Sequence, residues 1–341
     1  MAELKYSDVL KKVLQGGHME RPQAHWAFGQ IMDGLWSEAQ IAGLLVALAA
    51  KGESVDEITG AAQAMREHVL PIATDGADVI DTCGTGGTGL STFNVSTAAA
   101  LVCAGAGVKV AKHGNRTSTR ASGSADVLAE LGVNINAAGA VVERCLREAG
   151  LCFCFAVRCH PAMKYAAPIR RSLGVRTIFN VLGPLTNPAG AKRQLLGVFD
   201  AALTAVIANV LAALGSSRAM VVHAQDGLDE LSLTAPTKIS ELRNGQVTTT
   251  LVRPDDFGLP KAKIEDLIVA SPKESAQALR GVLAGDKGPK RDMVVLNAAA
   301  ALTVAEAAPT IALAIPPAQK AIDSGAAQAV LEKLIAISNV A

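Results

Sequence analysis

The sequence predicts an α/β protein in which a small all-helical domain lies beside a larger domain with a mostly parallel central sheet flanked by helices. Three observations lead to this fold class. Residues 1–72 carry helix signals only. From residue 78 onward, short apolar segments alternate with helical ones, as in a parallel sheet covered by helices. Half of the 341 residues are hydrophobic and the mean hydropathy is +0.30, which suits a large core.

Two capping signals mark helix starts in the N-terminal region. Ser37 is followed three residues later by Gln40, and Ser54 is followed in the same way by Glu57. A serine with Glu or Gln at this spacing satisfies two backbone donors of the first helical turn. Both serines precede alanine-rich runs, "AQIAGLLVALAAK" and "ITGAAQAM". We therefore expect helices to begin directly after them.

The remainder of the chain alternates between expected strands and expected helices. We expect strands at residues 78–82, 108–112, 151–157, 195–200, 219–225 and 247–252. We expect helices at residues 96–106, 124–132, 141–150, 160–174 and 201–215. Ligands of such sheets bind beyond the carboxyl ends of the strands, where helix N-termini point.

These patterns give a domain division. Residues 1–72 form the helical domain, and residues 163–190 pack onto it. Residues 73–162 and 191–341 form the α/β domain, which we expect to bind the ligand.

Composition excludes several classes of function. The net charge is +1 and aromatic residues are 3% of the chain, so neither a basic field nor a stacking platform for nucleic acid is expected. No apolar run reaches the ~18–20 residues needed to cross a bilayer, and the N-terminal residues lack an apolar signal core. Six cysteines in a chain of this length are typical of reduced thiols, so we expect a cytoplasmic protein.

Three of the cysteines gather in "LCFCFAVRCH", together with His160. The spacing of Cys152, Cys154 and Cys159 contains no Cys-x2-Cys pair of the kind that holds zinc. We interpret the segment as a buried strand with small apolar thiols rather than as a metal site.

A glycine-rich loop, "GTGGTG", follows the first expected strand. Gly84, Gly86 and Gly89 match a dinucleotide fingerprint, but the region ~20 residues on reads "VKVAKHGNR", which is basic where an acid is required. A nucleoside-triphosphate loop fails too, because Leu90 stands where lysine is needed. What remains is another phosphate site, in which glycines let backbone N–H groups approach an anion.

Two stretches add polar donors to this loop. The first follows the glycines and contains Ser91, Thr92, Asn94, Ser96 and Thr97. The second follows the next expected strand and contains Lys112, His113, Asn115, Arg116, Ser118, Thr119 and Arg120. The second stretch alone could be a solvated basic loop. Because both stretches follow neighbouring strands, they can face the same crevice, and together they indicate a polyphosphate ester as the ligand.

An acidic turn, "DGLDELS", contains Asp226, Asp229 and Glu230. In isolation it could be an ordinary polar turn, since Asp and Gly are common turn formers. Beside a polyphosphate site it favours Mg²⁺, which takes one or two carboxylates together with ligand phosphates.

These motifs, in this order, resemble the anthranilate phosphoribosyltransferase family of tryptophan biosynthesis. The matching segments are "GTGGTG", "TFNVST", "KHGNR" with "GSADVLAELG", "HPAMKYAAPIRRSLGVRTIFNVLGPLTNP" and "DGLDE". The resemblance implies a nucleoside-phosphorylase-like fold and a homodimer joined through the helical domain. It also implies transfer of phosphoribose from 5-phosphoribosyl 1-pyrophosphate to anthranilate, with Mg²⁺ as cofactor and pyrophosphate as product.

The resemblance implies roles for individual residues. Gly84, Asn115 and Arg170 contact anthranilate, and Ser96, Asp229 and Glu230 hold Mg²⁺. Arg171 lies ~100° further around the same helix and should face elsewhere. The residues implied to bind the sugar-pyrophosphate are Gly84, Gly87, Thr88, Thr92, Asn94, Val95, Ser96, Thr97, Lys112, His113, Gly114, Asn115, Arg116, Thr117, Ser118, Thr119, Arg120 and Ser124.

The sequence departs from the family pattern at two places. Thr88 stands where the family has an acid after its glycines, and Thr119–Arg120 replaces a pair of serines. Both changes concern metal stoichiometry and substrate affinity rather than the type of reaction.

Two rival functions remain. A pyrimidine nucleoside phosphorylase of similar fold would bind phosphate and a nucleoside without a metal-bound pyrophosphate, and "DGLDE" and "HPAMK" argue against it. A non-catalytic relative that binds nucleic acid is disfavoured by the net charge and by the low aromatic content.

Overall fold

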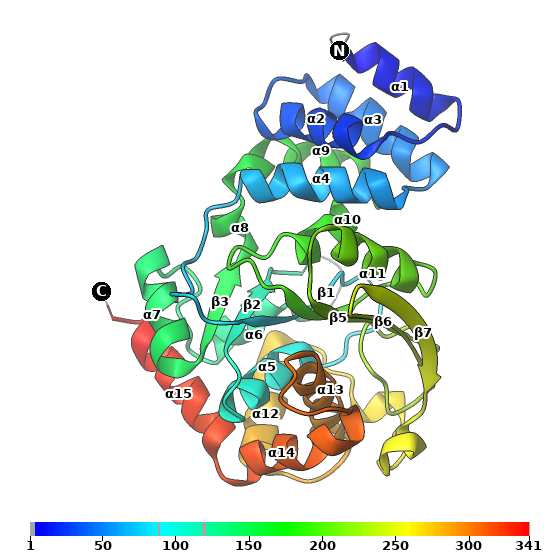
Figure 1. Ribbon diagram of the computed structural model, residues 1–341. Helices are drawn as coiled ribbons and strands as arrows, with labels where there is room; N and C mark the ends of the chain where they lie inside the picture. The colour runs from blue at the N-terminus through cyan, green and yellow to red at the C-terminus, as the bar shows by residue number, and fades with distance from the viewer. Residues whose placement is uncertain (1–3, 88, 118–120, 341) are drawn as a thin grey trace.

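A computed structural model describes residues 4–87, 89–117 and 121–340. Its N-terminal part is a bundle of helices, drawn in blue at the top of Figure 1. The bundle consists of α1 (Tyr6–Leu14), α2 (Arg21–Met32), α3 (Glu38–Lys51) and α4 (Val55–Glu67). Both expected capping boxes are present, since Ser37 Oγ accepts from Gln40 N and Ser54 Oγ accepts from Glu57 N. The two helix starts predicted from the sequence are therefore confirmed.

The central layer is a seven-stranded sheet with the order β3-β2-β1-β4-β5-β6-β7. The strands are β1 (Ile80–Gly84), β2 (Val110–Gly114), β3 (Leu151–Phe155), β4 (Arg193–Gly197), β5 (Arg218–Ala224), β6 (Thr237–Arg243) and β7 (Gln246–Val252). The first five strands in this order are parallel, whereas β6 and β7 add an antiparallel hairpin at one edge. The expectation of a mostly parallel sheet is confirmed.

Side chains along each strand contribute alternately to two hydrophobic cores, one on each face of the sheet, because successive side chains point to opposite faces. On β4, Leu195 belongs to the core below the sheet and Leu196 to the core above it. On β5, Met220 and Val221 divide in the same way. Both faces of the sheet are thus covered, as is usual for parallel strands.

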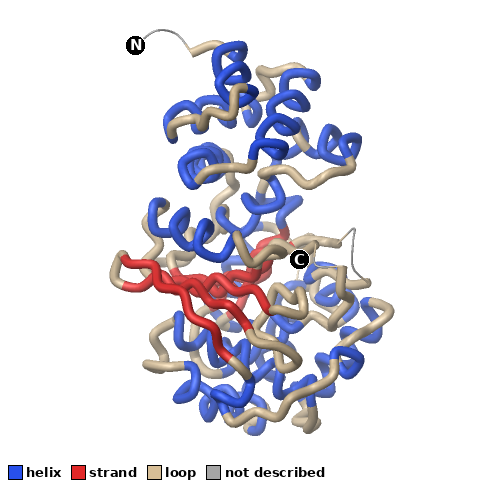
Figure 2. Tube along the Cα trace, turned by 90° about the vertical axis from the view of Figure 1, so that its right-hand side faces the viewer, coloured by secondary structure: helices blue, strands red, loops and turns tan. Residues whose placement is uncertain are grey.

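Two layers of helices enclose the sheet, as Figures 1 and 2 show. The bundle and α11 (Leu203–Ala213) lie on one side. The other layer contains α5 (Val95–Gly105), α6 (Ser124–Glu130), α12 (Pro272–Leu283), α13 (Pro289–Val304), α14 (Ile311–Asp323) and α15 (Ala326–Ser338). Next to them, α7 (Gly139–Ala149) packs on β3 and α15 at the edge of the sheet.

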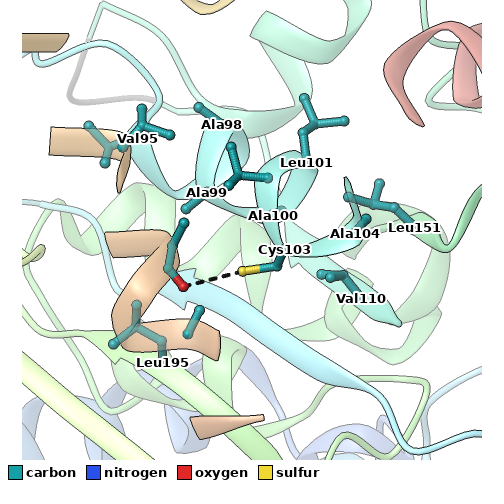
Figure 3. Close-up of a cluster of buried hydrophobic side chains, with 14 of the residues drawn as sticks. Val95, Ala98, Ala99, Ala100, Leu101, Cys103, Ala104, Val110, Leu151 and Leu195 are labelled. Carbon is teal, nitrogen blue, oxygen red and sulfur yellow. Dashed lines mark hydrogen bonds between the residues drawn. The ribbon is translucent and has the colours of Figure 1, made fainter. Parts of the chain in front are cut away.

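The lower core is built on close approach between α5 and α13. Figure 3 shows Ala98, Ala99, Ala100 and Leu101 of α5 gathered in this cluster. The thiol of Cys103 donates a weak hydrogen bond to the carbonyl of Ala298 at 3.6 Å. Small side chains on both helices let them pack tightly. The position of α13 beneath the strands is therefore fixed by this packing.

The segment between β3 and β4 returns to the helical bundle. It contains α8 (Ala156–Cys159), two 3-10 turns, α9 (Ala167–Leu173) and α10 (Phe179–Leu182). Ile169 and Phe179 share the upper core with Phe28 of α2, whose ring meets that of Phe179 edge-on at 5.7 Å. The expected association of residues 163–190 with the bundle as a domain stays a prediction. The domain boundaries themselves stay a prediction.

Two details of this segment differ from expectation. The strand at 151–157 ends at Phe155, and the helix expected over 160–174 is interrupted. Pro161 is the first residue of a 3-10 turn and Pro168 the second residue of α9, where the missing proline N–H prevents continuation of the preceding helical segment. Within the described residues, no helix combines the length and apolarity required to cross a bilayer.

Candidate phosphoribosyl-transfer site

Three parallel strands end in glycine at the same edge of the sheet: β1 at Gly84, β2 at Gly114 and β4 at Gly197. The reason is close approach by other groups. A Cβ on Gly84 would lie 2.7 Å from Oδ2 of Asp229, and a Cβ on Gly197 would overlap the carbonyl oxygen of Asp229. The acidic turn therefore lies directly over the ends of β1 and β4.

The glycine loop leaves β1 and is held against this turn. The N–H of Gly86 donates to Oδ2 of Asp229 at 3.1 Å. Gly86 and Gly87 have φ values of 65° and 78°, a left-handed conformation that glycine adopts without steric cost. Successive residues of this kind turn backbone N–H groups toward a common point, where an anion can bind.

An arginine outside the predicted set also holds the loop. Arg176, in the turn between α9 and α10, donates to the carbonyl of Gly87 at 2.5 Å. Its guanidinium stacks on the ring of Phe199, 4.3 Å from the ring centre, directly after β4. The contact joins the glycine loop to the segment that packs on the helical bundle.

The predicted metal-binding residues meet at a small cavity. The cavity has a volume of about 10 Å³, the space of roughly one water molecule. It is lined by Thr82, Cys83, Ser96, Ala99, Leu195, Gly197, Val222, Asp229, Glu230 and Asn297. Asp229 and Glu230 are 6% and 8% exposed. The structure thus brings Ser96 from the start of α5 together with both carboxylates.

Lys112 lies among these groups, fully covered by protein. Its ammonium donates to the hydroxyl of Ser96 at 3.2 Å and to the carbonyl of Thr82. Burial lowers the pKa of Lys112, and the charges of Asp81, Glu230 and Asp229 act in the opposite direction. The lysine therefore bridges β1, β2 and α5 while lying within the field of the acidic turn.

The donor set of this cavity fits Mg²⁺. Two carboxylates and one hydroxyl are hard oxygen ligands, and Mg²⁺ completes its shell with water and with phosphate oxygens of a ligand. No group of three or more His, Cys, Asp or Glu side chains able to hold a metal occurs in the ranges that the structure describes.

The third acid of the turn has a structural role. Asp226 accepts from the backbone N–H of Leu228 and from the hydroxyls of Ser232 and Thr234. These bonds close the turn and leave Asp229 and Glu230 facing the cavity. The predicted role of Asp229 and Glu230 as ligands of the cation stays a prediction.

The "KHGNR" turn folds back on itself after β2. Ser124 Oγ donates to the carbonyl of Asn115 at 3.3 Å, and it occupies the space that a Cβ on Gly114 would need. Asp126, at the start of α6, accepts from Arg116 at 2.7 Å and from the N–H of Thr117 and Gly123. The sequence analysis did not single out Asp126, although an acid in the first turn of a helix is a recognisable signal.

In the hydroxyl-rich segment after the glycine loop, one residue is hydrogen-bonded to other loops and helices, and two have hydroxyls without a partner among the described residues. Asn94 accepts from the hydroxyls of Ser122 and Ser275, each at 2.7 Å, so it fixes the loop between β2 and α6 against α12. Thr92 and Thr97 are buried, and their hydroxyl oxygens meet no partner among the described residues. Val95 contributes backbone at the first position of α5.

Two buried histidines join β2 to the segment after β3. His160 Nε2 and His113 Nε2 are 3.1 Å apart, and His113 Nδ1 is 3.0 Å from the carbonyl of Gly183. Burial lowers the pKa of His113 to about 3 and that of His160 to about 4, so both rings are neutral at pH 7. When both rings are neutral, these two contacts are compatible with one arrangement of protons. His113 donates from Nδ1 to the carbonyl of Gly183, and its Nε2 accepts from Nε2 of His160.

Arg170 of α9 is half-buried, and its guanidinium carbon lies 5.4 Å from the centre of the Phe179 ring. Burial lowers its pKa. Its guanidinium makes no hydrogen bond or ion pair with any residue in the described ranges. Arg171 is exposed, as expected from its position on the helix. Arg170 therefore presents planar donors beside an aromatic face.

Some predicted residues cannot be placed. Thr88, Ser118, Thr119 and Arg120 lie outside the described residues, so their expected contacts with phosphate stay predictions. Both departures from the family pattern fall within this set.

The fold and the strand-end site define a transferase of glycosyl groups. The helical bundle model of a glycosyl transferase family matches residues 7–69, and the a/b domain model of such a family matches residues 76–328. An anthranilate phosphoribosyltransferase from Moorella thermoacetica is 51% identical over 327 residues, covering 96% of each chain. One from Anaeromyxobacter sp. (strain K) is 50% identical and covers 97% of this chain and 98% of that protein.

Solved structures agree with these relatives. The crystal structure of anthranilate phosphoribosyltransferase from Thermus thermophilus superposes with a TM-score of 0.92 at 41% identity, covering 98% of this chain and 100% of that one. The Saccharomyces cerevisiae enzyme in complex with PRPP and Mg has a TM-score of 0.88 at 29% identity, covering 98% and 97% of the two chains. The chain belongs to the anthranilate phosphoribosyltransferase family.

Proposed function

We propose that this protein transfers phosphoribose from 5-phosphoribosyl 1-pyrophosphate to the amine of anthranilate, giving N-(5-phosphoribosyl)anthranilate and pyrophosphate in tryptophan biosynthesis. The relatives named above support this reaction. The observation that carries it is the meeting of three elements at one sheet edge. The glycine loop, the buried Lys112 and the acidic pair Asp229–Glu230 come together where a metal-bound polyphosphate can lie.

The residues of the chain would hold the sugar-pyrophosphate in two ways. Backbone N–H groups of the glycine loop would approach the phosphate oxygens, and the hydroxyls of Thr92 and Thr97, which have no partner among the described residues, would offer further donors. The ammonium of Lys112 supplies positive charge close to the leaving group. Mg²⁺, held by Asp229, Glu230 and Ser96, would neutralise the charge that develops on pyrophosphate as it leaves.

Anthranilate would be oriented by Arg170. A guanidinium without a partner among the described residues can pair with the carboxylate through two parallel hydrogen bonds. The adjacent Phe179 ring gives the aromatic acceptor an apolar surface. Asn115 and Gly84 would complete the contact, as the family motif implies. Such positioning raises the rate because it fixes the amine in line with the reacting carbon.

We also propose that the protein is a cytoplasmic homodimer joined through its helical bundle. Leu14, Leu35 and Val46 of the bundle and its loops are exposed large apolar side chains, and such groups favour a protein interface. All six cysteines are free and buried, which suits a reducing compartment.

The decisive experiment follows the fluorescence of anthranilate in the presence of 5-phosphoribosyl 1-pyrophosphate and Mg²⁺. We expect turnover that chelation with EDTA abolishes. The variant in which Asp229→Asn is combined with Glu230→Gln keeps the shape of both side chains but not their charge. It should lose nearly all activity with an unchanged circular dichroism spectrum. Failure to consume anthranilate, together with phosphorolysis of a pyrimidine nucleoside, would replace the proposal with its rival.

A further inference from the structure

Asn297 lies in the middle of α13 and holds both backbone groups of the residue that follows the acidic pair. Leu231 N donates to Asn297 Oδ1 at 3.0 Å, and Asn297 Nδ2 donates to the carbonyl of Leu231 at 2.9 Å. The side-chain amide of Asn297 thus makes the two hydrogen bonds to Leu231 that the backbone of a neighbouring strand would otherwise make. Glu230 precedes Leu231 directly, so the two bonds fix the backbone from which the second carboxylate projects.

The amide of Asn297 has no freedom to turn. Its second N–H donates to the carbonyl of Met293, one turn earlier in the same helix, at 2.9 Å. That bond determines which end of the amide faces Leu231. Asn297 is 2% exposed and its helix is buried along nearly its whole length. The hydrogen-bonded contact with Leu231 is therefore anchored to a closely packed, buried helix.

The other end of the acidic pair is fixed independently. Asp229 accepts from the N–H of Gly86 and packs against the glycines that end β1 and β4. Asn297 borders the same cavity as Ser96, Asp229 and Glu230. A two-residue acidic segment is thus held on one side by strand ends and on the other by a core asparagine.

We propose that Asn297 is a positioning residue for the cation, which presents the carboxylates of Asp229 and Glu230 in a fixed arrangement before the metal binds. This inference rests on the proposed role of the acidic pair. Groups that orient metal ligands without touching the metal commonly change its affinity by about 10- to 100-fold when they are removed. Loss of the Asn297 bonds should lower metal affinity in the same way, because the acidic turn would then have to be ordered each time the cation binds.

The structure supplies a matched pair of substitutions on the same helix. Thr303 is also buried in α13, and its hydroxyl donates to the carbonyl of Ala299 at 2.9 Å. Asn297→Thr can make the corresponding bond to the carbonyl of Met293 while losing both bonds to Leu231. Thr303→Val removes a buried bond within the helix but leaves the acidic turn untouched. If Asn297→Thr fails to fold, Asn297→Ser keeps the same hydroxyl with less volume.

The test measures binding of Mn²⁺ by electron paramagnetic resonance, with inorganic pyrophosphate present, and hydrogen exchange at the amide of Leu231. We expect Asn297→Thr to bind Mn²⁺ about tenfold or more weakly and to exchange faster at Leu231, with Thr303→Val like the parent in both. Parent-like Mn²⁺ affinity in Asn297→Thr despite faster exchange would overturn the inference alone. Parent-like affinity in the Asp229→Asn variant would overturn the proposed metal site and this inference with it.

Discussion

At the scale of single residues, Arg170 distinguishes acceptor binding from sugar-pyrophosphate binding. It has no protein partner within the described residues and lies against Phe179. Arg170→Ala should weaken anthranilate binding about tenfold or more, because a hydrogen bond to a charged group contributes about 1.5–3 kcal/mol. Affinity for the sugar-pyrophosphate should change little. Calorimetry with each substrate measures both, and Arg171→Ala on the exposed side of the helix is the control. Equal losses in the two variants would contradict the assignment.

The His113–His160 pair makes stability depend on pH. An unfolded histidine has a pKa of 6.5, whereas that of folded His160 is about 4. Between these values the unfolded chain binds more protons, so the free energy of unfolding decreases as pH falls from 6.5 toward 4. His160→Asn should make this decline shallower. Melting temperatures across that range measure it, with His25→Asn, at a half-buried histidine that pairs with Glu67, as the control. Parallel curves for parent and His160→Asn would rule out the histidine as the cause.

Residues of the site differ in how well the sequence predicts them. Ser96, Lys112, Asp229 and Glu230 stand in polar motifs after expected strands, and parallel strands bring such motifs to one edge. Asn297 stands alone in an alanine-rich helix, and Arg176 lies within the matching segment "HPAMKYAAPIRRSLGVRTIFNVLGPLTNP" without any contact predicted for it. Their partners are backbone groups far away in the chain, so nothing in their own neighbourhood reveals them.

At the scale of secondary structure elements, the acidic turn depends on the glycines beneath it. Gly197→Ala would place a methyl group against the carbonyl of Asp229, so the turn must move away from the strand ends. We expect loss of most activity, since small displacements of positioning groups cost about 100-fold in rate. Gly139→Ala, at the first position of α7 where a Cβ meets nothing within 4 Å, is the matched control. Steady-state rates of both variants make the comparison. Full activity in Gly197→Ala would show that the turn tolerates displacement.

The elements that were not foreseen have identifiable causes. The sequence analysis missed β6, because "TKISELR" places charged residues on both faces of the strand and so lacks a simple apolar–polar alternation. A usable signal was present in the Asn244–Gly245 pair, whose φ values of 51° and 75° suit a tight hairpin. The other expected strands and helices appear in the structure with shifts of a few residues at their ends, whereas the helix expected over residues 160–174 is interrupted.

At the scale of the whole molecule, the proposed dimer can be tested from its surface. Val46 of α3 is 45% exposed, and a charge there would oppose burial in an interface. Val46→Asp should shift the protein toward monomer, as measured by sedimentation velocity at several concentrations. Leu313→Asp, on α14 at the other end of the molecule, should leave the oligomeric state unchanged. Identical sedimentation of the two variants would argue against the helical bundle as the interface.

The position of β1 beside β4 has a consequence for how the chain acquires its activity. Ile80 pairs with Arg193, far along the chain, whereas the helices of the bundle form between near neighbours. Closing so long a loop costs entropy before the new contacts repay it, so distant strand pairs tend to form late. The acidic turn and the glycine loop meet at the ends of this strand pair, where Gly86 N donates to Asp229 Oδ2. A nascent or refolding chain should therefore gain most of its helix while still unable to bind pyrophosphate, and catalytic competence should arrive with the last stage of sheet assembly.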